Sequence, residues 1–206
     1  MKTNQIFKHC LAFTVFLLAL SVRGQGTFEY DQQSVSSDVL SGVVAGLQQY
    51  AVGQSFTPTL DSVGFIRLFI GDTVFTGSGA TVYVNLRSDS ITGPILASSD
   101  PVALPAGYTT PPLNFLFSTP VSVIPGVIYY FDVLEQAGDN HWGIFSDASY
   151  HYPGGTIFLN GVANPSWDLW FREGIVVPEP SSALLLLAGV GALAVFRRAK
   201  TKANPQ

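Results

Sequence analysis

The chain has 206 residues and a formal net charge of −4, and 47% of its residues are hydrophobic, 13% aromatic and only 12% charged. A typical soluble domain is about a quarter charged. Twenty glycines and 13 prolines leave little room for long helices. These values argue against a coiled coil, a disordered chain and a basic nucleic-acid binder, and the length fits one domain with terminal appendages.

The first 24 residues are predicted to be a secretory signal peptide. Two lysines precede an apolar run of ten residues at 11–20, which is too short to span a ~30 Å hydrocarbon core as a helix. Val22 and Gly24 fit the small-residue positions of a signal-peptidase site, so cleavage is expected after Gly24. The alternative is an N-terminal membrane anchor. Cys10, the only cysteine, lies in this segment, so the processed chain would hold no disulfide and no catalytic thiol.

The C-terminus begins with a stiff link and continues into an apolar segment. Pro178 and Pro180, on either side of Glu179, disfavour helix. An uncharged run of 14 residues then starts at Ala183 and ends at Phe196. It is predicted to form a single short transmembrane helix, which would thin the bilayer or draw polar groups to its ends.

Basic residues follow the apolar run, at Arg197, Arg198, Lys200 and Lys202. The positive-inside rule keeps such a cluster cytoplasmic. The N-terminal signal places the domain on the other side of the membrane, so both topological signals agree. The alternative, a helix of a soluble core, does not explain the basic cluster and polar tail at its end.

This C-terminal order resembles the PEP-CTERM sorting signal of Gram-negative bacteria over roughly the last thirty residues. The residues that carry the resemblance are Pro178, Glu179, Pro180, Arg197 and Arg198. The resemblance implies recognition by an exosortase, a membrane-embedded cysteine transpeptidase-like enzyme, and cleavage near the Pro-Glu-Pro motif. It also implies a bacterium that secretes exopolysaccharide. The protein would be a substrate of this system and not the sorting enzyme.

The expected organisation is a signal peptide at 1–24, an extracytoplasmic domain at 25–176, the sorting signal at 177–200 and a cytoplasmic tail at 201–206. Residues 25–180, which include Glu179 of the sorting motif, hold three arginines, no lysine and all 14 acidic residues, a formal charge of −11. Such a domain should repel nucleic acid and anionic membrane surfaces. Its acidic surface suits calcium, cationic partners or neutral polysaccharide.

The pattern of the middle region is that of β-structure. Short runs rich in β-branched and aromatic residues are separated by Gly- and Pro-containing turns. The expected strands span 54–57, 63–70, 80–87, 95–98, 114–117, 128–134, 142–145, 156–160 and 169–173. Segment 38–49 is expected to be a short helix or an irregular opening loop. The spacing predicts an all-β, jelly-roll-like β-sandwich.

The segment 80–87 shows the clearest alternation. Val82, Val84 and Leu86 are expected on the core face. The residues expected to point outward are Thr81, Tyr83, Asn85 and Arg87.

The middle region is also similar to the extracellular β-sandwich domains that bacteria couple to interchangeable surface anchors. Segments 53–58, 85–87, 118–121 and 125–131 carry the similarity, the last with a Pro-Gly turn that introduces a Tyr-rich strand. The resemblance implies a fold and an extracellular setting, and no particular activity.

No catalytic signature is found in the sequence. His141 and His151, the histidines that remain after signal removal, lack the spacing of a zinc motif. There is no Gly-x-Ser-x-Gly elbow. A pair of carboxylates placed for glycoside hydrolysis cannot be read from sequence. We therefore expect no enzyme and no cofactor, with a secreted hydrolase as the third alternative.

Carbohydrate binding is the sharper alternative to a structural role. Sugars stack on exposed aromatic rings while neighbouring polar side chains bond their hydroxyl groups. Aromatic residues in such mixed surroundings are Trp142, Tyr150, Tyr152 and Trp167. The competing interpretation places large aromatics in the sandwich core.

Calcium is a weaker alternative. Oxygen ligands from loop aspartates can hold this ion, and Asp31 and Asp139 are the candidates. Neither lies in an alternating Asp-x-Asp run, so a role in capping turns competes with calcium binding.

Together these features predict an exported, non-enzymatic envelope or extracellular-matrix protein with a structural or adhesive role. Signal peptidase and an exosortase would process it. Before processing, the inner membrane would hold it with the domain in the periplasm of a Gram-negative bacterium. Outside the cell the protein is expected to contact exopolysaccharide. In the alternative interpretation it is a carbohydrate-binding module, and exopolysaccharide is its ligand.

Overall fold

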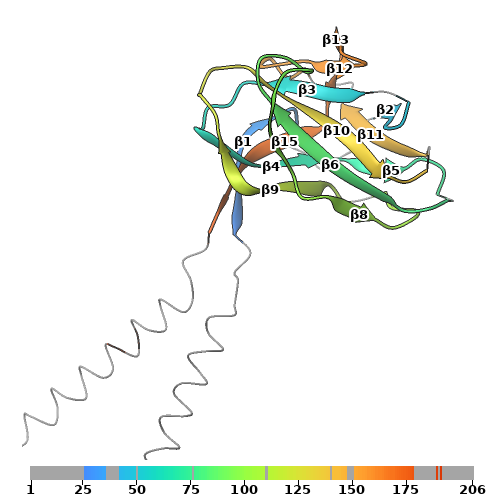
Figure 1. Ribbon diagram of the computed structural model, residues 1–206, viewed down its shortest axis with the longest axis horizontal. Helices are drawn as coiled ribbons and strands as arrows, with labels where there is room; N and C mark the ends of the chain where they lie inside the picture. Colours follow the sequence, from blue (N-terminus) through green and yellow to red (C-terminus); the bar gives the residue numbers. More distant parts are fainter. Residues whose placement is uncertain are drawn as a thin grey trace, which may run out of the picture. The chain divides into compact units, whose positions relative to one another are not determined.

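The computed structural model describes residues 26–35, 42–49, 51–75, 77–109, 111–139, 141–147, 151–178, 189 and 191. Nearly all regular structure in these residues is β, which confirms the predicted fold class (Figure 1). The strands are β1 (Thr27–Gln33), β2 (Val43–Gly46), β3 (Val52–Phe56), β4 (Ser62–Leu68), β5 (Ile70–Asp72), β6 (Ala80–Arg87), β7 (Ile95–Ser98), β8 (Val102–Leu104), β9 (Leu113–Ser122), β10 (Tyr129–Ala137), β11 (Trp142–Asp147), β12 (Ile157–Leu159), β13 (Val162–Asn164), β14 (Asp168–Leu169) and β15 (Phe171–Val177).

Antiparallel sheets form the domain. One sheet has the order β1-β15-β4-β9, and a larger one has the order β13-β12-β3-β10-β6-β7 with β8 also paired to β6. A third sheet has the order β14-β11-β2, with β5 also paired to β11. Phe28 to Val176 form one compact unit.

Apolar side chains from both main sheets meet in one core. Phe56 and Phe131 come from the sheet that contains β3 and β10, and Phe171 comes from β15 in the four-stranded sheet β1-β15-β4-β9. All three are fully buried. The ring centroids of Phe131 and Phe171 lie 5.6 Å apart, as expected for packed aromatic rings. This contact between inner faces is the arrangement of a β-sandwich.

The predicted strand 80–87 matches β6 in both bounds. Val82, Val84 and Leu86 are fully buried, as their alternation predicted. Asn85 was expected to point outward to solvent, but only 3% of it is exposed. The hydroxyl of Ser98 on the neighbouring β7 donates to its Oδ1 at 2.7 Å, so the outer face of the sheet is covered at this point.

Two other expectations need correction. The expected helix or loop at 38–49 contains β2 and then a turn at 47–49, while residues 38–41 lie outside the described residues. The expected strand 63–70 is divided at Phe69, because β4 pairs with β9 and β15 while β5 pairs with β11. β1 was not predicted, since its polar sequence lacks the apolar alternation of a strand.

The predicted signal peptide lies outside the described residues, as does the predicted transmembrane helix except for Gly189 and Gly191. Within the part of the chain that the structure describes, no helix is long and apolar enough to cross a membrane.

Candidate functional site

The aromatic residues predicted to bind sugar lie in different environments. Trp142 is fully buried in β11 and Tyr152 is 6% exposed, so both rings belong to the core. Trp167 is 39% exposed, before β14. Tyr150 lies outside the described residues. Of the described candidates, Trp167 alone presents a ring to solvent to the extent that sugar stacking needs.

Tyr152 occupies a structural position. Its hydroxyl donates to Oε1 of Gln32 on β1 at 2.9 Å and accepts from the amide of Thr57 at 3.2 Å. Its ring packs edge-on against Phe171 at 5.2 Å. Burial, together with the nearby carboxylates, raises the pKa of Tyr152 to about 12. The side chain thus joins β1 to the end of β3.

The neighbouring Asp168 fixes the backbone of the same region. Its carboxylate accepts from the amide of Tyr152 at 2.8 Å and from Nε2 of Gln54 at 2.7 Å. Gln54 in turn accepts from the amide of Leu169 at 3.0 Å. Burial raises the pKa of Asp168. These side chains are enclosed and satisfied by one another, which is the pattern of a core network and not of an open site.

Glu173 on β15 is the most unusual acidic group. It is fully buried, and neither of its carboxyl oxygens has a well-formed hydrogen bond. Burial, followed by the charge of nearby Asp31, raises the pKa of Glu173 to about 9. The group is therefore a neutral acid at pH 7. Glu173 falls within the predicted strand 169–173, and nothing in that local sequence indicates that its carboxyl group is buried.

The two calcium candidates use their oxygens within the chain. The carboxylate of Asp31 accepts from the amides of Thr59 and Leu60 at 2.7 and 2.9 Å, and from the Thr59 hydroxyl. Burial alone would raise the pKa of Asp31, but these bonds outweigh it and lower the pKa. Asp139 accepts from the amide of Ser78 at 2.7 Å, which is the main cause of its lowered pKa. No group of three or more metal-ligating side chains is found among the described residues.

A second exposed aromatic lies beside the loop that holds Asp139. Phe75 is 67% exposed and has a φ of 60°, a region that non-glycine residues rarely occupy. The carboxylate of Asp72 holds it there by accepting from the amides of Val74 and Phe75, both at 3.0 Å. Phe75 was not predicted, because no pattern in its neighbourhood distinguishes an exposed phenylalanine from a core one.

The two loops are bonded to each other. The backbone oxygen of His141 accepts from both the amide and the hydroxyl of Thr73, each at 2.8 Å. The amide of Gly107 also donates to Asp72, at 3.0 Å. This end of the domain is therefore a rigid group of loops with one exposed phenylalanine.

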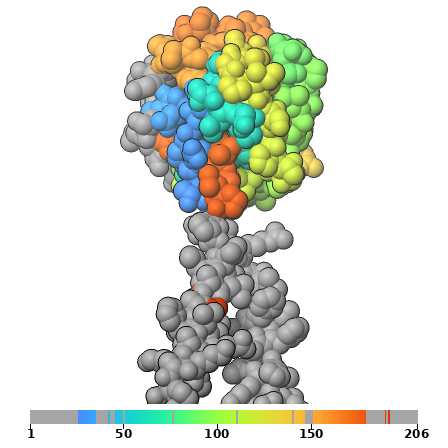
Figure 2. Space-filling model, turned by 90° about the vertical axis from the view of Figure 1, so that its left-hand side faces the viewer, coloured from blue at the N-terminus to red at the C-terminus, as the bar shows by residue number. Residues whose placement is uncertain are grey.

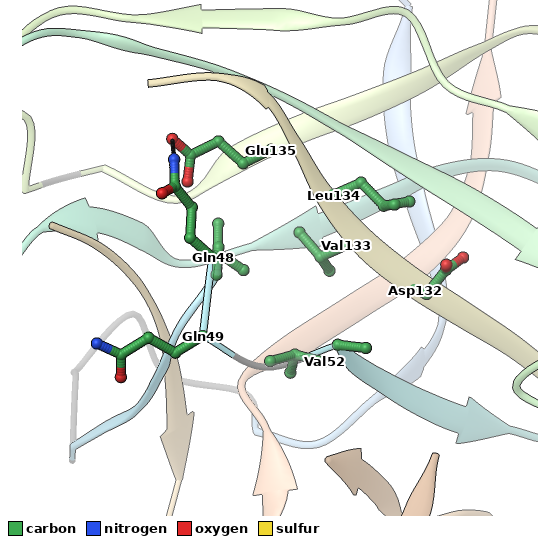
Figure 3. Close-up of a pocket in the computed structure, with 9 residues that line it drawn as sticks. Gln48, Gln49, Val52, Asp132, Val133, Leu134 and Glu135 are labelled. Carbon is green, nitrogen blue, oxygen red and sulfur yellow. Dashed lines mark hydrogen bonds between the residues drawn. The ribbon is translucent and has the colours of Figure 1, made fainter. Parts of the chain in front are cut away.

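A pocket of about 270 Å³ opens between the start of β3 and the end of β10 (Figure 3). Gln48 and Glu135 point toward each other within it, and the Gln48 amide donates to Glu135 at 2.9 Å. The other Glu135 oxygen is enclosed without a partner, and burial raises the pKa of this residue. Asp132 points away from that pair (Figure 3) and is held by Arg87, with 2.9 Å between Nε and Oδ1. The described lining has hydrogen-bonding groups but no ring for a sugar to stack on.

The sorting residues mark the end of the domain. Pro178 is exposed directly after β15, and the other four predicted motif residues lie outside the described residues.

Comparison with known proteins agrees with this end of the chain. Residues 176–200 match the PEP-CTERM protein-sorting motif. No curated protein matches the chain. The match begins on the last residues of β15, so the sorting motif follows the folded domain without a spacer. The chain thus carries the PEP-CTERM motif of an exported, membrane-associated protein that an exosortase sorts toward the cell surface.

Proposed function

We propose that this protein is a non-enzymatic β-sandwich that the PEP-CTERM system delivers to the envelope or extracellular matrix, where it has a structural or adhesive role. The sorting motif directly after β15 carries the proposal. Signal peptidase removes residues 1–24, and segment 183–196 holds the chain in the inner membrane of a Gram-negative bacterium until the exosortase acts.

The use of the acidic residues supports a non-catalytic role. Asp31, Asp72, Asp139 and Asp168 all accept hydrogen bonds from backbone amides of this chain. Carboxylates engaged in this way fix loops. Glu173 is fully buried and has no access to solvent.

Fractionation of the producing bacterium tests the sorting proposal. In the parent strain the mature protein should leave the inner-membrane fraction, and mass spectrometry should find it cleaved near Pro178. In a strain without exosortase, or with Glu179→Ala, the full tail should remain and the protein should stay in the membrane. Asp100→Ala, an exposed change within the domain, is the matched control. Equal fractionation of all these samples would contradict the proposal.

The second candidate function is binding of exopolysaccharide. Trp167 and Phe75 favour it, because both present aromatic rings to solvent, 39% and 67% exposed. Retention of the protein on purified exopolysaccharide should fall with Trp167→Ala or Phe75→Ala. Val162→Ala, which truncates a 70% exposed non-aromatic side chain, should leave it unchanged. Loss of retention in all three variants, or in none, would count against an aromatic sugar site.

A further inference from the structure

The connection between β9 and β10 presents apolar side chains to solvent. Ile124 is 64% exposed, Val127 45% and Ile128 50%. They belong to a stretch, residues 101–131, that contains no Asp, Glu, Lys or Arg, although residues 25–180 as a whole carry a charge of −11. We call residues 123–128 the apolar tip. Exposed apolar side chains gathered on one part of a surface are typical of interaction sites.

The apolar tip is rigid. The amide of Val127 donates to the oxygen of Ile124 at 3.1 Å, and Gly126 has a φ of +80°, which with Pro125 makes a type II turn. The hydroxyl of Tyr129 accepts from the amide of Ile124 at 3.0 Å. The side chains are therefore held outward before any partner binds, which lowers the entropic cost of binding.

The tip follows the end of β9, which lies two strands from the end of β15, where the chain leaves the domain. A Cβ on Gly64 of β4 would lie 3.3 Å from the amide nitrogen of Val176, and Val63 pairs with Val121 on the other side of β4. Two strand spacings, about 10 Å, thus separate the end of β15 from the end of β9. The amide of Gly126 donates to the oxygen of Pro58, at 2.9 Å. Figure 2 shows β1 in blue beside β15 in orange-red, with yellow segments from the β9–β10 part of the chain on the same face.

The segment between β15 and the predicted membrane anchor is short enough to keep the domain near the membrane. Seven Cα-to-Cα steps lead from Val176 to Ala183, where the apolar run begins. Fully extended, they span at most ~25 Å. With the apolar run inserted, this end of the domain remains close to the lipid surface. Its effective concentration there is high, so a contact too weak to act alone can form.

The distribution of charged residues limits which part of the domain surface can contact lipid. The acidic surface is repelled by anionic headgroups, whereas the tip has no charge to desolvate. Exposed Asp61 borders the tip, and its backbone oxygen accepts from the amide of Val123 at 2.9 Å. Contact should therefore be stronger with zwitterionic than with anionic lipid.

We propose that the apolar tip dips into the lipid interface beside the anchor and orients the domain on the membrane until the tail is cut. This inference rests on the proposed anchor at 183–196. After cleavage the tip alone is too small to hold the domain, so the same event that cuts the tail releases the contact.

Lipid quenching tests the contact in the full chain. In a Cys10→Ser background a fluorescent label is placed on Ile128→Cys in the tip, Val162→Cys as an exposed control or Leu186→Cys in the tail. The proteins are reconstituted in phosphatidylcholine vesicles that contain nitroxide-labelled lipid. We expect loss of fluorescence at 186 and 128 but not at 162. Adding Ile124→Ser and Val127→Ser should abolish the loss at 128 without lowering the unfolding temperature.

The labels at 128 and 186 test the lipid contact of the tip and the membrane anchor separately. Quenching at 186 without quenching at 128 would overturn the tip contact and leave the anchor in place. No quenching at 186 would overturn the anchor and the inference that rests on it. A label at 128 that responds to protein concentration and not to quencher would overturn the lipid contact in favour of a second copy of the chain.

Discussion

Phe69 and Trp170 pack against each other at two places where a single residue separates strands of different sheets. Their ring centroids lie 4.5 Å apart at an interplanar angle of 70°. Phe69 separates β4 from β5, and Trp170 separates β14 from β15. The two corners are also linked through Phe145, whose amide donates to the Phe69 oxygen and whose oxygen accepts from the Trp170 amide. This contact joins the third sheet to the sandwich.

Replacing Phe69 by Ala should lower the free energy of unfolding by about 3–5 kcal/mol, because the site is fully buried and its cavity cannot collapse around Trp170. Urea denaturation would measure the loss. Val162→Ala, at an exposed position, should change stability little. Similar stability of the two variants would contradict the role of this contact.

Stability should depend on pH through Glu173. Burial raises its pKa from 4.5 to about 9, so the folded protein keeps a proton that the unfolded chain loses above pH 4.5. The stabilisation that comes from this raised pKa is complete below pH 4.5 and is lost as the pH rises to about 9. Over that range the free energy of unfolding falls by up to ~1.4 kcal/mol per pH unit. Glu173→Gln should flatten this decline in urea denaturation at several pH values. Glu29→Gln, an exposed change on β1, should keep it. An unchanged slope in Glu173→Gln would refute the assignment.

Tyr152→Phe separates a structural role from sugar binding. The change keeps the ring but leaves Gln32 and the Thr57 amide without their partner, and should cost about 1–3 kcal/mol. Exopolysaccharide retention should not change at a temperature where the variant is folded. Tyr130→Phe, on the half-buried face of β10, is the control for the loss of a hydroxyl. Normal stability with lost retention would reverse the interpretation.

Gly155→Ala should destabilise the domain, on the order of 1–3 kcal/mol. A Cβ at this position would lie 1.8 Å from the backbone oxygen of Ser55, so β3 or the loop must move. At Gly46 the nearest atoms are 3.7 Å away, and Gly46→Ala should be tolerated. Thermal unfolding of the two variants compares them directly, and equal unfolding temperatures would argue against the close approach.

Calcium should leave the unfolding temperature unchanged, in excess or after chelation. The reason is that Asp31 and Asp139 already accept hydrogen bonds from backbone amides. Scanning calorimetry with calcium and with chelator would measure this. A rise with calcium that Asp139→Asn abolishes would restore the calcium alternative.

The local sequence pattern predicts a strand where apolar and polar residues alternate. It does not predict a strand that is stabilised mainly by pairing with a distant segment. The alternation at 80–87 predicted β6 with its bounds and its core residues. β1 and β2 were missed, because neither shows that alternation and each is stabilised by a distant strand, β15 or β11. Trp142 and Trp167 show the same limit, since only tertiary packing decides which ring is buried.

The sorting motif can be recognised in the amino-acid sequence alone, since its residues at 176–200 lie near one another in the chain. The β-sandwich class is also predictable from sequence, because turn residues and alternation are local. Three features depend on tertiary contacts: the burial of Glu173, the role of Tyr152 in holding two strands together and the exposure of the apolar tip between β9 and β10. Burial and charge environment arise from contacts between residues far apart in sequence, and no local pattern contains them.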